Sequence, residues 1–169
     1  YSIDEAFLEL KGFENYNLEE YGKEIRKKIL KWTGIPVSIG FAPTKALAKV
    51  ANRISKKFDK KTTGVYVINS KEKREKTLKW LKIEDVWGIG FKHATRLKSY
   101  KINKAYDFIT LPDDWVRKQM SVVGLRLKKE LEGKSVLSIE ENRSPKKAIA
   151  TTRSFEKNLT SFEDLKERI

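Results

Sequence analysis

The stretch that decides the fold is the opening one, residues 1–10, which reads YSIDEAFLEL. Its apolar residues favour burial in a strand, so the adjacent carboxylates Asp4 and Glu5 need a partner. A hard cation such as Mg²⁺ takes oxygen ligands and leaves positions for substrate phosphates, which suits phosphoryl chemistry. Neighbouring side chains of an ideal strand point to opposite faces, so both carboxylates reach one site only across a turn or bulge. The structural alternative is an edge strand whose charges face water.

The composition is that of a folded, soluble protein. In 169 residues, 39% are hydrophobic and 36% charged, a mixture that excludes both a membrane protein and a disordered chain. The sequence shows neither a signal-peptide pattern nor a run of roughly 20 apolar residues that could span a membrane. The absence of cysteine fits a reducing, cytoplasmic location. Because the chain begins at Tyr1, directly in a strand-like segment, we expect an excised fragment.

The formal net charge of +14 suggests a polyanionic partner. A nucleic-acid backbone is the commonest one, although an anionic membrane surface and simple solubility remain alternatives. The charge is spread along the chain, and residues 71–101 are the most basic part for their length, with 10 basic and 4 acidic side chains.

The first part of the chain predicts a sheet with helices packed on it. Asn17 with Glu20 three positions later resembles a capping box, and Gly34 is a helix stop. The predicted elements are a helix over residues 18–33, a strand over 35–41, a helix from 44 to 57, a loop over 58–64 and a strand over 65–68.

The second of these helices offers a candidate anion site. A strand, a short turn and a basic helix start place Thr44, Lys45 and backbone N–H groups where an anion could bind, and Lys56 lies at the far end of the helix. The alternative is that these lysines only face water, as most lysines on amphipathic helices do.

Two segments, YSIDEAF at residues 1–7 and GIPVSIGFAPTKALAKVANRISKK at residues 34–57, resemble the palm of the Y-family (translesion) DNA polymerases, most closely the UmuC branch of bacterial DNA polymerase V. The resemblance implies that Asp4 and Glu5 are catalytic and bind metal, with two Mg²⁺ ions in the complete enzyme. It also implies that Lys56 contacts the incoming nucleotide triphosphate. The family pattern includes an earlier strand with another metal-binding Asp and finger residues, which this sequence lacks, so we expect the isolated chain to be inactive.

Residues 71–133 predict a small all-α module. A charged helix over 71–82 precedes Trp87-Gly88-Ile89-Gly90 and a basic helix over 91–100, the order of a helix-hairpin-helix element. Glycines let a backbone approach a phosphate, and the following helix N-terminus offers N–H donors. The candidate DNA-binding residues are Gly88, Gly90, Lys92, Arg96 and Lys98. The alternative is an ordinary packing turn, but such an element belongs to the thumb of the family that the palm resembles.

Three further helices are predicted, over residues 105–109, from Asp113 or Asp114 to Met120, and over 125–131. The apolar side chains of this region are expected in the core rather than on a base-stacking surface: Trp115, Met120, Val123, Leu127 and Leu131. The sole histidine, His93, is expected to project from the hairpin helix without binding a metal.

The C-terminal part resembles the entry to the family's little finger domain. Residues 134–147 are predicted to be a linker, followed by a strand over 148–155 and a helix over 160–168.

The predicted fold is therefore mixed α/β (α+β), with a palm part over residues 1–70, a thumb over 71–133, the linker, and the start of a little finger domain over 148–169. The resemblance implies template-directed nucleotidyl transfer past damaged bases, in DNA repair and the SOS response. It implies primer-template DNA and a deoxynucleoside triphosphate as substrates, and a UmuD-type subunit, RecA and a sliding clamp as partners. The alternatives are a helix-hairpin-helix DNA-binding module without chemistry and a nucleotide cyclase, whose related palm gives no reason for the second module.

Overall fold

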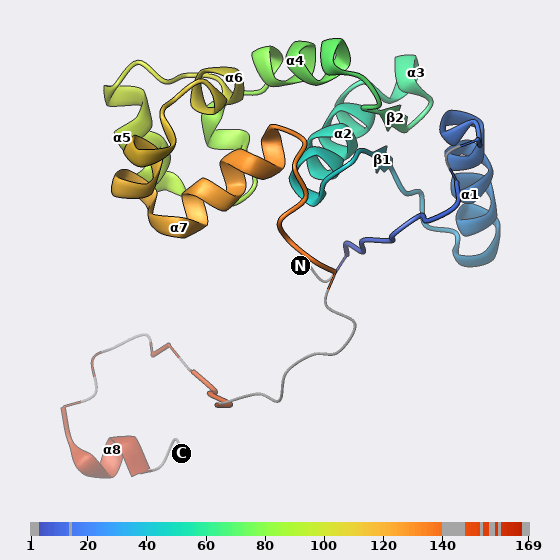
Figure 1. Ribbon diagram of the computed structural model, residues 1–169. Helices are drawn as coiled ribbons and strands as arrows, with labels where there is room; N and C mark the ends of the chain where they lie inside the picture. Colours follow the sequence, from blue (N-terminus) through green and yellow to red (C-terminus); the bar gives the residue numbers. More distant parts are fainter. Residues whose placement is uncertain are drawn as a thin grey trace. The chain divides into compact units, whose positions relative to one another are not determined.

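A computed structural model of the chain describes residues 4–13, 15–139, 148–152, 154–155, 158 and 160–166. The chain separates into two compact units, Tyr1–Ile139 and Glu140–Ile169 (Figure 1). The mixed α/β class is confirmed by a small parallel sheet with helices in the first unit. The boundary between palm and thumb at residue 70 stays a prediction.

Helix α1 (Leu18–Thr33) begins and ends where its capping residues predict. The Asn17 side chain accepts hydrogen bonds from the backbone N–H groups of Glu19 at 3.1 Å and Glu20 at 3.3 Å. At the other end, Gly34 has a φ of 73°, and its N–H donates to the Leu30 carbonyl at 2.9 Å. The helix thus satisfies backbone groups at both ends locally.

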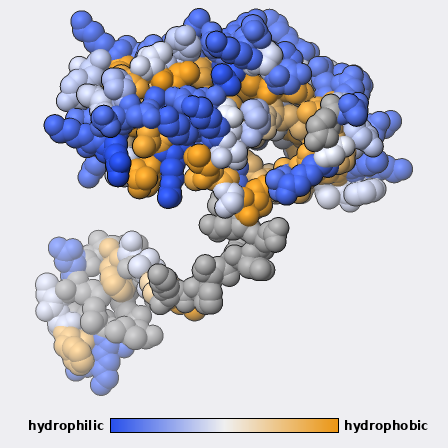
Figure 2. Space-filling model, viewed as in Figure 1, coloured by the Kyte–Doolittle hydropathy of each residue, from blue (hydrophilic) through white to orange (hydrophobic). Residues whose placement is uncertain are grey.

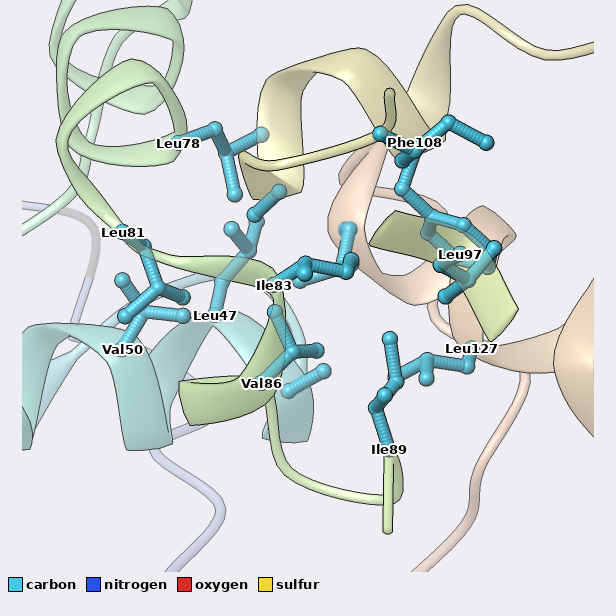
Figure 3. Packing of buried hydrophobic residues seen from close by; sticks show 14 of the residues in the cluster. Leu47, Val50, Leu78, Leu81, Ile83, Val86, Ile89, Leu97, Phe108 and Leu127 are labelled. Atoms are coloured by element: carbon cyan, nitrogen blue, oxygen red, sulfur yellow. The ribbon is translucent and has the colours of Figure 1, made fainter. Parts of the chain in front are cut away.

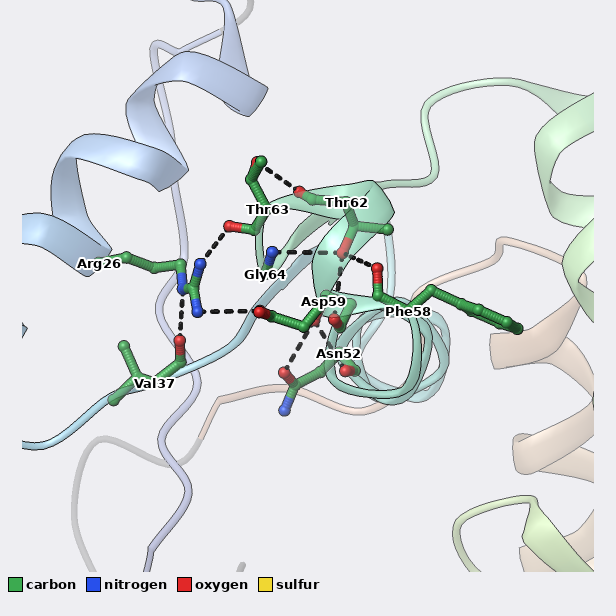
Figure 4. A network of polar contacts seen from close by, with 9 residues as sticks. Arg26, Val37, Asn52, Phe58, Asp59, Thr62, Thr63 and Gly64 are labelled. Carbon is green, nitrogen blue, oxygen red and sulfur yellow. Dashed lines mark hydrogen bonds and ion pairs between the residues drawn. The ribbon is translucent and has the colours of Figure 1, made fainter.

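The side chain of Arg26, on α1, forms hydrogen bonds with residues that shortly precede the two strands of the sheet (Figure 4). Its guanidinium donates to the Val37 carbonyl at 2.6 Å and to the Thr63 carbonyl, and it pairs with Asp59 at 3.0 Å. Asp59 begins the short helix α3 (Asp59–Thr62), which lies within the predicted loop. The planar guanidinium suits this role because it presents several donors in a fixed geometry.

Strands β1 (Ile39–Phe41) and β2 (Val65–Val67) pair in parallel, with Gly40 opposite Tyr66. Helix α2 (Lys45–Lys57) connects them and lies along the sheet (Figure 1). A Cβ atom on Gly40 would lie 2.2 Å from the backbone nitrogen of Asn52, so only glycine allows this close approach of strand and helix.

The predicted opening strand is wrong for the part of it that the structure describes. Asp4 lies in a turn, and residues 5–10 have no regular secondary structure. A strand needs a ladder partner, and within the described residues β1 and β2 pair only with each other.

The remaining regular elements that the structure describes in the first unit are helices, as predicted for residues 71–133. The elements are α4 (Lys71–Trp80), the 3₁₀ helix η1 (Ile83–Asp85), α5 (Phe91–Ser99), α6 (Ala105–Ile109) and α7 (Asp113–Leu131). Ser121, with a φ of 62°, breaks the backbone of α7, so its two halves correspond to the two predicted helices. The predicted aspartate cap is wrong: Pro112 occupies the N-cap position, and both aspartates lie in the first turn, where carboxylates favour the helix dipole.

One hydrophobic cluster runs through the first unit (Figure 3). It contains the side chains of Leu47 and Val50 from α2, Leu78 from α4, Leu97 from α5 and Leu127 from α7. Of the residues predicted for the core, Val123 is an error, because it follows the break at Ser121 and is 66% exposed.

In the second unit, α8 (Phe162–Lys166) lies within the predicted C-terminal helix. The predicted strand over 148–155 is wrong, because residues 148–152, 154 and 155 are exposed and without regular secondary structure. Residues 140–147 of the predicted linker and 167–168 of the predicted helix lie outside the described residues.

Hydrophilic residues make up much of the visible face of the first unit, with apolar residues exposed between them (Figure 2). Among the described residues, no helix has the length and apolar character needed to cross a bilayer.

Candidate carboxylate site and nucleic-acid interface

The carboxylate pair of the opening segment is divided between two environments. Asp4 is exposed, whereas Glu5 is half-buried and pairs with the ammonium group of Lys49 on α2, at 2.7 Å. No group of three or more His, Cys, Asp or Glu side chains that could hold a metal ion occurs in the described part of the chain. Within this part of the chain, the ammonium group of Lys49 is a charged partner of Glu5. The metal-binding role of Asp4 and Glu5 stays a prediction.

Lys49 also connects the carboxylate segment to the second module. Its ammonium nitrogen lies 5.2 Å from the centroid of the Trp87 ring, and the ring of Phe7 lies 6.1 Å from the same ring. Trp87 directly precedes the predicted hairpin glycines. The sequence pattern predicted Trp87 only as part of a connection and gave no role to Lys49, so this contact was not predicted.

The predicted anion site at the start of α2 is already filled by an anion of the chain itself. Glu130, on α7, is fully buried, and its carboxylate accepts a hydrogen bond from the backbone N–H of Ala46 at 3.2 Å. The Thr44 hydroxyl donates to the Glu130 carbonyl at 2.7 Å, and the Lys45 ammonium donates to the Ser138 carbonyl at 2.5 Å. The expectation of an external anion at this helix end is therefore wrong.

Lys56 and Lys57 differ at the other end of α2. Both are exposed, but the ammonium of Lys57 lies 5.2 Å from the centroid of the Trp80 ring. Lys56 follows Lys49 by seven residues, which is two helical turns and about 10 Å along the axis. The two lysines therefore share a face of the helix.

The predicted glycine turn of the hairpin, which we call the first hairpin, spans residues 87–90. Only one of its two glycines has a positive φ. Gly88 has a φ of 89°, whereas Gly90 has a φ of −75° and forms the N-cap of α5. A Cβ atom on Gly90 would meet nothing within 4 Å, and the cap makes no side-chain hydrogen bond. Gly90 therefore does not use the positive φ that glycine permits, and what it offers is an open approach to the N–H groups of α5.

The basic side chains of α5 differ in whether an acidic side chain pairs with them. Lys92 and Arg96 are exposed, and Arg96 contacts the ring nitrogen Nδ1 of the half-buried His93 at 3.2 Å. Lys98 pairs with Glu84 of η1 at 2.9 Å. This side-chain hydrogen bond from Lys98 is the main reason why the pKa of Glu84 lies below its usual value.

Known proteins resemble this chain in sequence and in structure. The impB/mucB/samB family model matches residues 1–53. The chain is 36% identical, over its whole length, to Protein UmuC of Salmonella typhimurium, and it covers 40% of that protein. Over 98% of its length it is 31% identical to DNA polymerase IV of Saccharolobus solfataricus, of which it covers 46%.

Solved structures give the same result. The structure resembles an insertion ternary complex of Dbh DNA polymerase, with a TM-score of 0.58 and 30% identity, over 76% of this chain and 36% of that one. It also resembles a DinB family error prone DNA polymerase from Sulfolobus solfataricus, with a TM-score of 0.60 and 28% identity, over 78% of this chain and 39% of that one.

These similarities confirm the predicted resemblance to the Y-family DNA polymerases. Within that family, the identity to UmuC confirms the resemblance to the UmuC branch. The chain spans less than half the length of these curated relatives.

Proposed function

We propose that this chain is part of an error-prone translesion DNA polymerase, to which it supplies a portion of the palm and a DNA-holding thumb. The observation that carries the proposal is the identity to UmuC along the whole chain, which includes both the carboxylate segment and the hairpin. The proposed reaction of the whole protein is template-directed nucleotidyl transfer past damaged bases.

In this proposal, Asp4 and Glu5 belong to the catalytic centre. A divalent metal, expected to be Mg²⁺, takes part in the reaction of the whole protein, where it would stabilise negative charge on phosphate oxygens. We expect further ligands from elsewhere in the whole protein, because the family pattern includes an earlier strand with another metal-binding Asp. We assign no step to the metal in this chain.

The proposed triphosphate contact is Lys56. Its position on the same face of α2 as Lys49 supports this role, because Lys49 reaches the carboxylate Glu5. A lysine ammonium at this distance along the helix would favour a polyphosphate that extends away from the carboxylates.

The proposed DNA contact is the first hairpin with α5. The exposed N-terminus of this nine-residue helix, together with Lys92 and Arg96, suits a phosphate backbone. Lys98 contributes less in the free chain, because Glu84 neutralises it. The proposed contacts are all to the phosphate backbone and none is to a base edge. Binding should therefore not depend on the DNA sequence.

The proposed partners of the whole protein are a UmuD-type subunit, RecA and a sliding clamp, and its proposed location is the cytoplasm. These follow from the resemblance to the UmuC branch.

Primer extension tests the proposal. We expect no extension by the 169-residue chain, and extension with Mg²⁺ by a longer protein that contains it. Asp4→Ala and Glu5→Ala together should abolish that activity without changing duplex binding in fluorescence anisotropy. Extension by the double variant would refute the catalytic role of the pair. Duplex binding without extension by any longer protein would instead favour the DNA-binding module without chemistry.

A further inference from the structure

The carboxylate of Glu5 is held by Lys49 in a partly buried setting. The side chains are 32% and 23% exposed, respectively, and the ammonium and carboxylate are 2.7 Å apart. A pair at this depth is screened less than a fully exposed one. Glu5 therefore has a cation as its neighbour before any metal is present.

A second contact keeps Lys49 at this position. The Trp87 ring lies beneath its ammonium group, at 5.2 Å, in the range of a cation–π interaction. Trp87 in turn contacts Phe7, two residues from Glu5. The lysine is thus held between a carboxylate of the opening segment and an aromatic ring of the first hairpin.

A lysine in this position opposes a divalent cation at the same carboxylate. The ammonium group is paired with a carboxylate oxygen that a metal ion would use as a ligand. It also repels a second positive charge a few ångströms away.

We propose that Lys49 is a resident cation at Glu5, and that a divalent metal reaches this carboxylate only when Lys49 moves away. The inference rests on the proposed function in one respect, since it treats Glu5 as a metal ligand of the whole protein. It adds a gate to that site: the gate is closed in the free chain, and Trp87 connects it to the proposed DNA-binding hairpin.

Mn²⁺ binding to the full 169-residue chain, measured by electron paramagnetic resonance, tests the gate. Lys49→Met should tighten Mn²⁺ binding by about threefold to tenfold, since one nearby positive charge is removed. The gain should disappear in Lys49→Met combined with Glu5→Gln. Lys23→Met is the matched control, because Lys23 pairs with Glu20 at 2.8 Å on α1, away from the site. Unchanged or weaker binding by Lys49→Met, or an equal gain in Lys23→Met, overturns the proposal.

A second measurement needs neither metal nor activity. With 5-fluorotryptophan incorporated, the ¹⁹F resonance of Trp87 can be identified from its loss in Trp87→Phe. Glu5→Gln should shift this resonance in the wild-type chain, because Lys49 is released, and should leave it unchanged in a Lys49→Met background. Circular dichroism checks that each variant is folded, and Lys49→Gln replaces Lys49→Met if the latter is not. A resonance that ignores Glu5→Gln overturns the inference, whereas failure of primer extension would refute the polymerase proposal and leave this contact intact.

Discussion

The buried carboxylate of Glu130 accepts a hydrogen bond from the backbone N–H of Ala46, in the first turn of α2, at 3.2 Å. The same carboxylate accepts hydrogen bonds from the N–H groups of Val136 at 2.7 Å and Leu137 at 3.0 Å. One side chain of α7 thus accepts hydrogen bonds from the start of α2 and from the segment that follows α7. An anion at a helix N-terminus is favourable by hydrogen bonding and by the helix dipole.

Removing this anion should destabilise the first unit. Glu130→Gln turns an acceptor into a donor that faces an N–H group, and should lower the free energy of unfolding by about 1–3 kcal/mol. Glu130→Ala leaves three N–H groups without this acceptor and should cost about 3 kcal/mol or more. Urea unfolding followed by circular dichroism measures both changes.

The control is Glu24→Gln, which removes the same charge from an exposed position of α1. It should change the unfolding free energy by less than about 0.5 kcal/mol. If Glu130→Gln lowers the unfolding free energy no more than Glu24→Gln does, the Glu130 carboxylate does not stabilise the contact between α7 and α2.

The local signals in the sequence were sufficient for most helices. Asn17 and Gly34 mark the two ends of α1. Thr44 caps α2, and the Thr44 side chain accepts a hydrogen bond from the backbone N–H of Leu47 at 3.3 Å. Each of these contacts joins residues within one helix end, so the pattern of a few neighbours determines it.

The role of Glu130 could not be predicted in this way. In the run LKKEL it reads as one of several charged helix positions, and its burial depends on packing against Ala46, 84 residues earlier. The pairing of Lys49 with Glu5 joins residues 44 positions apart, so it too depends on tertiary packing and not on a local pattern. The strand prediction failed for residues 4–10 for a related reason, since apolar residues can favour a strand without supplying a ladder partner.

Lys56 should matter for nucleotide use in the whole polymerase. Lys56→Ala should weaken nucleotide binding by about 1.5–3 kcal/mol, the value of one charge-assisted contact to phosphate, while duplex affinity changes little. Nucleotide titrations in primer extension measure the first effect, and fluorescence anisotropy measures the second.

Lys57→Ala is the internal control for Lys56. It removes an equal charge one residue away and loses a contact with Trp80, worth about 0.5–1 kcal/mol of stability rather than nucleotide affinity. Equal nucleotide titrations for the two variants would make Lys56 an ordinary surface lysine.

The stability of the first unit at acid pH should depend on Asp113, at the start of α7. Hydrogen bonds from Lys128, at 2.5 Å, and Lys129, at 2.6 Å, lower the pKa of this carboxyl from 3.8 to about 2. Because the pKa is lower in the folded state than in the unfolded state, the stabilisation is complete above pH 5 and is lost as the pH falls toward 2. Asp113→Asn should therefore reduce stability at neutral pH and flatten its decline between about pH 4 and 2.

Asp114→Asn is the matched control for this pH dependence, since Asp114 is exposed in the same first turn of α7. Urea unfolding of both variants from pH 2 to 7 separates the lysine contacts from the shared helix-dipole effect. Identical pH profiles for the two variants would contradict the role of Lys128 and Lys129.

The two hairpin glycines should fail in different ways when each is replaced by valine. Gly88 has a φ of 89°, so Gly88→Val should strain the backbone and lower stability by about 1–3 kcal/mol. Gly90 has an ordinary φ and open space around its Cβ position, so Gly90→Val should fold and lose only about 1 kcal/mol, because valine is a poorer N-cap residue than glycine. Its branched side chain would instead cover the N–H groups of α5 and weaken duplex binding.

Fluorescence anisotropy with duplexes of two sequences, over a series of salt concentrations, measures this separation on the 169-residue chain. Affinity should fall steeply with salt and be the same for both sequences, and Lys92→Ala should reduce the salt slope by about 0.9, the contribution of one phosphate. Lys98→Ala should change the slope less, because Glu84 already neutralises Lys98 in the free chain. Since Gly90→Val is expected to fold normally, a folded variant with unchanged affinity and unchanged slope would exclude the hairpin as the DNA contact and leave it a packing turn.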